Sequence, residues 1–416
     1  MSDDVLEVWL GQGHIATLTR TRRRQLQLQY RDEAIATFAL DSIVMSVALP
    51  VRAGRYRGAA VERWVDSMLP EGETRSTVEQ WFGVQRGDSF GLLREIGADC
   101  AGAIAFLRPG HHPKLGLAGA RLLNDEGLAA AVAALPAHPL GVDQEVRVSL
   151  AGLQAKLLLA RTSDGRWARP ADGAPSTHIL KPEPTWAAGL CAAELFTLRL
   201  AALSGMPAAE GELIVAGGRK ALVLTRFDRQ VADGEVSRIH QEDGCAALGI
   251  DPTGDYKYQS PHPNSPSLAR LAKILRSYGN DVPRELTRLL EAATLRVAVG
   301  DTDGHARNYA FLHVGSGVEL APIYDAAPTY RFASSRRVGL WLAGQSMLSS
   351  ITAQHLFDEF TGWQIPADLA RRTTVEVLER LSAAVPRAAA EVPQLPSELA
   401  TEISERIRRL LDQAAS

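Results

Sequence analysis

The sequence predicts an α+β fold in which a β-rich first half precedes a helical second half. Short runs between residues 5 and 60 alternate apolar and polar side chains and are separated by Gly, Arg and Asp, which is typical of strands in a small sheet. From about residue 264 onward, apolar residues recur at helical spacing in one segment after another. A chain of 416 residues is long enough for two or three domains with a sizeable core.

Most of the predicted strands lie in the first half. Strands are expected over EVRVSL and KLLLAR, joined by the turn AGLQ, and over GELIVAG and KALVLTRFDR, joined by the turn Gly217–Gly218. Between these pairs, the loop SDGRWARPADGAPST leads to a third strand, HILKPEP, which is ended by its prolines. SIVMSVALPV also carries the strand pattern of the first 60 residues.

Helices are expected on both sides of these strands. In the first half, helices cover much of residues 58–107, where SFGLLREIG is ended by Gly97. A further helix is expected over TWAAGLCAAELFTLRLAALSG, ended by Gly205. A connector with one short helix is expected over HHPKLGLAG and GLAAAVAALPAHPLG. The second half contains SLARLAKILRSYG, PRELTRLLEAATLRVAVG and several helices between residues 352 and 414.

The composition is that of an ordinary globular protein, with 46% hydrophobic residues, 22% charged residues and a net charge of −3. This balance argues against a polybasic nucleic-acid binder. The three cysteines fit neither a disulfide framework nor zinc spacing, so we expect small buried hydrophobes in a reducing compartment. The N-terminus lacks the features of a signal peptide and no apolar run is long enough to span a membrane, so a cytoplasmic protein is expected.

One charged stretch interrupts the helical half, DTDGHARN, between apolar segments. Asp303 precedes Asn308 with the spacing D-x4-N, and protein kinases place their catalytic Asp and a metal-binding Asn at this spacing. The Asp accepts the proton of the attacking hydroxyl, and the Asn oxygen reaches the metal on the same phosphates. Alone, the pattern arises often by chance, and a helix cap followed by a polar helix face is the more common explanation for it.

Further residues follow the order of a kinase. Asp325 comes after the apolar runs YAFLHV and VELAPIY, where a kinase has its second metal-binding carboxylate, although YDAAP lacks the DFG signature and Asp325 would also suit a helix N-cap. Lys181 lies in the third strand and Glu194 in the next helix, the order of the kinase lysine and its glutamate partner. A lysine that extends to solvent and an exposed helix charge are the alternatives.

Other chemistries fit less well. The turn from Ser149 to Lys156 is no Walker A or GxGxxG motif, although its small residues would allow a close approach to phosphate. His305 has no second ligand at zinc spacing, and the calcium loop that begins at Asp301 lacks the required Gly and Glu. The phrase VAVGDTDG is similar to a phosphatase DxD motif, but no βαβ series surrounds it.

Taken together, these motifs resemble the HipA family of bacterial toxin kinases. The likeness runs nearly from end to end: SVALPV, DSMLPEGETR, LLREIGADCAGAI, SLAGLQAKLLL, THILKPE, ALVLTRFDR, QEDGCAALGI, DTDGHARNYAF and LAPIYDAAP follow the family's order. The resemblance implies a protein-kinase-like two-lobed fold. It implies a HipA N-terminal subdomain over residues 1–108, an N-lobe with phosphate loop and hinge over 109–243, and an all-helical C-terminal lobe over 244–416.

The resemblance also implies the roles of individual residues. Asp303 would be the catalytic proton acceptor, while Asn308 and Asp325 would hold Mg²⁺. Ser149 would be the autophosphorylated serine. The ATP site would comprise Ala151, Gly152, Leu153, Gln154, Ala155, Lys156 and Lys181 at the phosphates, Thr225, Arg226 and Phe227 as the hinge beside adenine, and His305, Arg307, Asn308, Tyr324 and Asp325. Thr225 stands where relatives often carry a glutamate, so backbone hydrogen bonds would make the adenine contact. Asp301 is left with a structural role.

The expected function is that of an ATP- and Mg²⁺-dependent Ser/Thr protein kinase toxin of a toxin–antitoxin system. By the resemblance, its partners would be a helix-turn-helix antitoxin (HipB-like), operator DNA through that antitoxin, and a protein substrate such as an aminoacyl-tRNA synthetase. A catalytically weak kinase fold that serves as a transcriptional co-repressor, and a small-molecule kinase, are the competing hypotheses.

Overall fold

A computed structural model describes residues 4–135, 137–143, 145–150, 154–232 and 234–415. The chain divides into two compact units. The first comprises Met1–Pro182, Ile214–Gly254 and Leu312–Ser316, and the second comprises Glu183–Leu213, Asp255–Phe311 and Gly317–Ser416. Within the described part of the chain, no helix is both long and apolar enough to cross a membrane.

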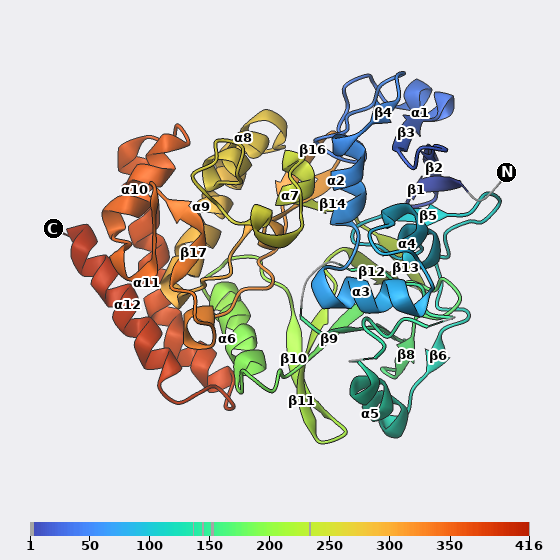
Figure 1. Cartoon of the computed structure of the whole chain (residues 1–416). Helices are drawn as coiled ribbons and strands as arrows, with labels where there is room; N and C mark the ends of the chain where they lie inside the picture. Colours follow the sequence, from blue (N-terminus) through green and yellow to red (C-terminus); the bar gives the residue numbers. More distant parts are fainter. Residues whose placement is uncertain (1–3, 136, 144, 151–153, 233, 416) are drawn as a thin grey trace. The chain divides into compact units, whose positions relative to one another are not determined.

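The first unit opens with a five-stranded antiparallel sheet of order β4-β3-β2-β1-β5 (Figure 1). Its strands are β1 (Val5–Leu10), β2 (Gly13–Arg20), β3 (Leu26–Tyr30), β4 (Tyr56–Arg57) and β5 (Ile104–Leu107). The accompanying helices are α1 (Asp32–Thr37), α2 (Ala59–Ser67), α3 (Gly72–Trp81) and α4 (Ser89–Ile96). Trp64 of α2, Phe90 of α4 and Phe106 of β5 are fully buried in the shared core, so alternation in the strands and helical spacing in α2 and α4 converge on one interior.

SIVMSVALPV forms no strand, contrary to the prediction. Met45 and Leu49 are buried as the pattern requires, but side chains replace a partner strand. Glu242 accepts from Val47 N–H (2.7 Å), and Tyr30 donates to the carbonyl of Leu49 (2.7 Å). Because side chains form hydrogen bonds with backbone groups of this segment, the segment can be buried without pairing to a neighbouring strand.

A second, six-stranded sheet has the order β10-β11-β9-β7-β8-β6. Its strands are β6 (Arg121–Leu122), β7 (Leu157–Arg161), β8 (Trp167–Arg169), β9 (His178–Pro182), β10 (Gly211–Ala216) and β11 (Arg219–Thr225). Helix α5 (Asp125–Ala134) covers one face through Leu128 and Val132, while Leu158 of β7 belongs to the core of the first sheet. The strand pattern thus buries both faces of the central strands.

Two local predictions in this region were wrong. EVRVSL is no strand: Val146 and Val148 are buried but make only single bridges, and the Asp143 carboxylate accepts from Val146 N–H (2.9 Å) in place of a ladder. Conversely, Trp167–Arg169 within the predicted loop forms β8. The remaining elements of the first unit are β12 (Arg229–Ala232), β13 (Glu235–Arg238), β14 (Gln241–Asp243) and α7 (Gly244–Leu248).

The second unit is mainly helical, as predicted. Its helices are α6 (Leu190–Leu203), α8 (Leu268–Tyr278), α9 (Val282–Val299), α10 (Ala353–Gly362), α11 (Ala367–Glu391) and α12 (Leu399–Ala415). The long helix α11 contacts α6, α9, α10 and α12, and Figure 1 shows α11 and α12 side by side. Strands β16 (Gly317–Leu320), β17 (Arg337–Leu342) and β18 (Gln345–Met347) are additions to the predicted all-helical lobe.

The remaining elements are short. β15 (Ala310–Val314) begins in the second unit and ends in the first. The helical turns are η1 (Gly254–Lys257), η2 (Ala306–Asn308), η3 (Thr329–Arg331) and η4 (Leu348–Ser350). All three cysteines are buried and unbridged, as expected from the sequence.

Candidate active site

The polar sequence DTDGHARN begins where α9 ends. Gly300 has φ +81°, and its N–H donates to Arg296 O (3.0 Å). A Cβ at Gly300 would lie 2.4 Å from the ring of Tyr330, so glycine is required sterically as well as conformationally. The chain therefore leaves the helix at this residue and continues as a loop that ends in η2.

Arg296, in the last turn of α9, holds this loop from the inside. It is 4% exposed, forms an ion pair with Asp301, and donates to Asn308 O (2.9 Å) and Tyr324 O (3.0 Å). A further contact of 3.3 Å reaches Asp325 O. Arg296 is not among the site residues predicted from the sequence. The signal was available, since a charged side chain in the apolar turn LRVAV, directly before a polar loop, needs buried partners.

Asp301 has a structural role, in agreement with the expectation. It is 2% exposed, and its Oδ1 accepts from Asp303 N–H (3.0 Å) and from the Thr329 hydroxyl (3.2 Å). Burial raises the pKa of Asp301 to about 6, against the opposing effect of the Arg296 guanidinium. At neutral pH this carboxylate is ionised and fixes the start of the loop.

Asp303 is accessible to solvent and is fixed at both its backbone and its side chain. Its N–H donates to Asp301 Oδ1 and to Thr329 Oγ1 (3.1 Å), and the Tyr258 hydroxyl donates to its Oδ1. Desolvation by the surrounding protein raises the pKa of Asp303, while the Tyr258 hydrogen bond acts in the opposite direction. The arrangement provides an oriented carboxylate that solvent can reach.

Asn308 and Asp325, the two predicted metal-holding residues, lie side by side. Asn308 Nδ2 donates to Asp325 O (2.9 Å) and contacts Asp325 Oδ2 (3.3 Å). Asn308 Oδ1 is buried and has no hydrogen-bond partner among the described residues. A carboxylate and an unpartnered amide oxygen are the kind of ligands that Mg²⁺ prefers, so the pair fits such an ion. Asp325 has φ +49°, a conformation that residues with side chains seldom adopt.

The other predicted residues of this unit surround the same loop. His305 is 7% exposed and meets the Tyr258 ring edge-on, with ring centroids 5.0 Å apart. Burial, reinforced by the charge of Lys257, holds the pKa of His305 well below its usual value, so the imidazole is neutral at pH 7. Tyr324 donates to the carbonyl oxygen of Arg307 (2.5 Å). Asp303, His305, Arg307, Asn308, Tyr324 and Asp325 thus all belong to one region of the second unit.

The predicted phosphate-binding residues belong to the first unit. Lys181 lies in β9, opposite Leu222 of β11, and is 5% exposed. Lys156 is 7% exposed and directly precedes β7, the other neighbour of β9. Gln154 and Ala155 come just before it, and Ala151, Gly152 and Leu153 lie outside the described residues. Glu194 is buried in α6 of the second unit.

Ser149, the predicted autophosphorylation site, is fully buried. Its N–H donates to Asp99 O (3.0 Å), and its hydroxyl donates to Met68 O. A phosphoryl group could reach this hydroxyl only after the segment had moved out of its present position.

The hinge residues follow β11. Thr225 is exposed at the end of the strand, opposite His178. Arg226 is 2% exposed, and its N–H donates to Thr177 O (2.9 Å). Phe227 is half-buried. Both the backbone donor and the side chain of Arg226 are therefore engaged inside the unit.

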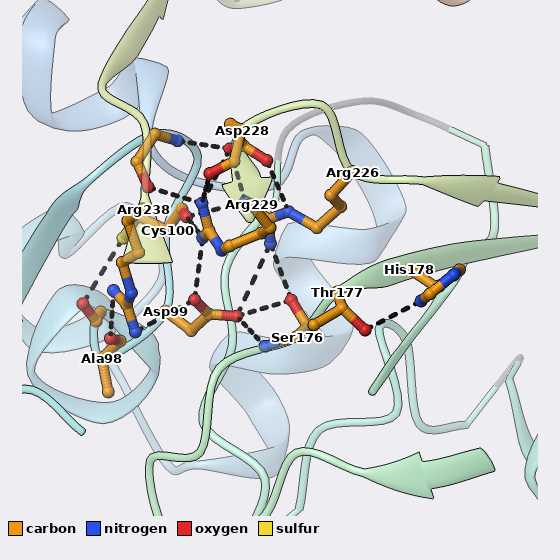
Figure 2. A network of polar contacts seen from close by, with 12 residues as sticks. Ala98, Asp99, Cys100, Ser176, Thr177, His178, Arg226, Asp228, Arg229 and Arg238 are labelled. Carbon is orange, nitrogen blue, oxygen red and sulfur yellow. Dashed lines mark hydrogen bonds and ion pairs between the residues drawn. The ribbon is translucent and has the colours of Figure 1, made fainter. Parts of the chain in front are cut away.

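Figure 2 shows the polar network that receives Arg226. Asp228 accepts from Arg226 Nε (2.9 Å), and Arg226 Nη1 donates to Ser176 (2.7 Å). Asp99 accepts from Arg229 Nη2 (2.9 Å) and from the Ser176 hydroxyl (2.6 Å). The guanidinium groups hold the pKa values of both aspartates well below their usual range, against the effect of burial. The family motif TRFDR predicts only a hinge, so this network is a feature that the structure adds.

Family models match both parts of the chain. The HipA-like C-terminal domain matches residues 148–389, and the HipA N-terminal domain matches residues 6–107. The chain belongs to the HipA family. This confirms the family that the sequence motifs predicted.

Individual relatives agree with this assignment. "Putative kinase Y4mE" of Sinorhizobium fredii is 31% identical over 424 residues, covering 100% of this chain and 98% of that protein. "Serine/threonine-protein kinase toxin HipA" of Shewanella oneidensis is 29% identical over 368 residues, covering 84% of this chain and 82% of the relative. The predicted class of enzyme is therefore confirmed, and the chain is a Ser/Thr protein kinase of the HipA family.

The fold agrees as well. A solved structure of Shewanella oneidensis HipA, in complex with HipB and operator DNA, superposes with a TM-score of 0.81 and 25% identity. The match covers 98% of this chain and 96% of the other. The α+β, kinase-like fold class is thereby confirmed.

Proposed function

We propose that this HipA-family kinase is a toxin that uses ATP and Mg²⁺ to phosphorylate its own Ser149 and a cellular protein, and that a helix-turn-helix antitoxin neutralises it. The observation that carries the chemical part is the arrangement of Asp303, Asn308 and Asp325 around one loop. It supplies an oriented carboxylate and, beside it, two oxygen ligands suited to Mg²⁺.

In the proposed reaction, the acceptor hydroxyl attacks the γ-phosphorus of ATP. A new O–P bond forms, the bond to the β-phosphate oxygen breaks, ADP leaves, and the hydroxyl proton passes to Asp303. Asn308 Oδ1 and the Asp325 carboxylate would hold Mg²⁺, which neutralises charge on the phosphates when bound. This chain's remaining task is positioning, which supplies much of the acceleration in phosphoryl transfer.

The nucleotide site is proposed on the residues that carry the family resemblance. Lys181 and the segment Ala151–Lys156 would bind the phosphates, because ammonium groups and backbone N–H groups both favour phosphate oxygens. His305, Arg307 and Tyr324 would line the site. Adenine would rest beside Thr225, Arg226 and Phe227, and the engaged N–H of Arg226 leaves Thr225 and Phe227 as the contacts to test first.

Phosphorylation of Ser149 would displace the segment around this residue from its buried position. The buried hydroxyl donates to Met68 O, and a phosphoserine carries about −1.5 to −2 charges and cannot donate that hydrogen bond when ionised. Burial of that charge beside a carbonyl oxygen is unfavourable. The phosphorylated segment would therefore leave its site in the first unit.

The proposed partners rest on similarity. The solved Shewanella oneidensis complex contains HipA, HipB and operator DNA, and this supports a HipB-like antitoxin and an operator for the present chain. The family resemblance favours a translation component, such as an aminoacyl-tRNA synthetase, as the substrate. We also infer the division of labour predicted from the sequence, with residues 1–108 as the N-terminal subdomain, 109–243 for the nucleotide and 244–416 for catalysis.

Purified protein with Mg²⁺ and γ-labelled ATP tests the proposal. Label should appear on Ser149, and Asp303→Asn should slow its incorporation by about 10²–10⁴-fold, because the base is lost while the shape is kept. Ser149→Ala should remove label from this position. A wild-type protein that binds antitoxin and operator DNA but transfers no phosphate would instead establish the co-repressor function.

A further inference from the structure

Tyr258 directly follows η1 and is held in place by the second unit's own backbone. Its N–H donates to Asp255 O (3.0 Å), and the N–H of the next residue, Gln259, donates to Gly339 O (2.9 Å) of β17. The Gln259 side chain accepts from Trp341 N–H (2.8 Å). The segment is therefore attached to β17 immediately beyond Tyr258.

The Tyr258 side chain joins the two functional parts of the polar loop. Its hydroxyl donates to Asp303 Oδ1, and its ring meets the His305 ring at 5.0 Å, almost perpendicularly at 81°. Lys257, the preceding residue, is 3% exposed, and its ammonium lies 5.9 Å from the centre of the Tyr258 ring. Tyr258 therefore contacts Asp303 directly and packs against His305, which follows Asp303 in the same loop.

A carboxylate that receives a proton during phosphoryl transfer must present one oxygen to the incoming hydroxyl. Rotation about the Cβ–Cγ bond of an unrestrained Asp would spread both oxygens over many orientations. In this chain the backbone N–H of Asp303 is bound by Asp301 and Thr329, and Oδ1 is bound by Tyr258. These contacts restrain the backbone of Asp303 and one oxygen of its carboxylate, so they favour a single orientation of the group.

We propose that Tyr258 is a positioning residue for phosphoryl transfer, whose hydroxyl holds the Asp303 carboxylate in its proton-accepting orientation. This inference rests on the proposed function, since it presupposes that Asp303 is the base. It assigns a catalytic contribution to a residue outside the loop that carries the catalytic motif. The alternative is a gate, in which the phenol occupies the place of the substrate hydroxyl and must be displaced before the reaction.

Tyr258→Phe separates these possibilities, because it removes one oxygen and keeps the ring against His305. A positioning role predicts that kcat falls by about 10- to 100-fold, the expected effect of losing a hydrogen bond to a charged group. The KM for ATP and the melting temperature should stay as in the wild type. Tyr256→Phe is the matched control, since Tyr256 lies in η1 two residues before Tyr258, is 66% exposed, and should tolerate the change without effect.

Three results would overturn the inference: an unchanged kcat in Tyr258→Phe, a rise in kcat/KM for the acceptor as a gate requires, or an equal loss of kcat in Tyr256→Phe. Failure of the proposed function looks different, because wild-type protein would then transfer no phosphate or Asp303→Asn would remain as active as wild type. The Tyr258→Phe result is therefore interpreted only if the wild-type protein transfers phosphate and Asp303→Asn abolishes that transfer.

Discussion

At the scale of single residues, Asp325 shows how conformation and chemistry are combined. Its φ of +49° lies in the left-handed region, where a side chain costs free energy, on the order of 1–3 kcal/mol at strained sites. Asp and Asn enter this region more readily than most residues. A glycine would fit the backbone better but would supply no ligand, so the strain accompanies a carboxylate placed beside Asn308.

The first prediction concerns Asp325→Asn. Because Asn also tolerates the left-handed conformation, the melting temperature should change little. The phosphoryl-transfer rate at saturating ATP should fall by about 10²-fold or more, since a charged metal ligand becomes neutral. Raised Mg²⁺ should restore part of the rate. Thermal unfolding and a Mg²⁺ titration of the rate measure both effects, and a full rate at low Mg²⁺ would remove Asp325 from the metal site.

At the scale of elements, strand β17 supports the polar loop by direct backbone contact. A Cβ at Gly339 would lie 2.6 Å from Gly304 C and 2.8 Å from His305 N. Both are backbone atoms, which cannot avoid the clash by a change of rotamer. Gly339 is thus required by the close approach of two backbones. Strand β17 is not among the predicted elements, and its contact with the loop joins residues that lie far apart in the chain.

The second prediction follows from this contact. Gly339→Ala should push the loop away, destabilise the second unit by roughly 1–3 kcal/mol, and reduce activity more than ATP binding. Gly362→Ala is the control, because a Cβ there meets nothing within 4 Å. Differential scanning calorimetry with a rate measurement provides the comparison. If both variants had the same stability and the same rate, the loop would be able to move away from the new Cβ without loss of stability or activity.

At the scale of the whole molecule, titratable groups inside the first unit make its stability depend on pH. In the first unit, burial lowers the pKa of His178 to about 4 and of His240 to about 3, so both are neutral in the fold. The pKa values of Asp99 and Asp228 are also depressed, chiefly by the neighbouring arginines acting against burial. For every one of these groups, the unfolded chain binds protons at a higher pH than the folded chain does.

The third prediction is that the first unit loses stability as the pH falls, because its unfolded chain binds these protons at a higher pH than its folded chain does. The stabilisation is complete above the unfolded pKa values, and it is lost as the pH falls, first below about 6.5 for the histidines and then below about 4 for the aspartates. Amide hydrogen exchange in β9 and β11 should therefore speed up between pH 7 and pH 4, after correction for the intrinsic rate. His178→Asn combined with His240→Asn should flatten the upper part of this dependence. A wild-type first unit equally protected at pH 7 and pH 4 would contradict it.

The sequence by itself determined the family, the fold class and the ends of some helices, since periodicity, glycines and motif order are local properties that do not depend on distant contacts. Gly97 directly follows α4, and Gly205 lies two residues beyond the end of α6, close to the helix ends predicted at these glycines. Only the tertiary structure decided the parts that depend on distant partners. EVRVSL and SIVMSVALPV look like strands, yet carboxylate, phenol and imidazole groups bind their backbones instead.

Dependence on distant partners also separates the site residues that were predicted from those that were not. Asp303, Asn308 and Asp325 could be named because their chemistry is tied to a spacing in the chain. Arg296, Thr329 and Tyr258 hold those residues through hydrogen bonds, and no local pattern marks a side chain whose role depends on what it reaches. A sequence specifies which groups are present, whereas the free energy of burying and pairing them decides which groups meet.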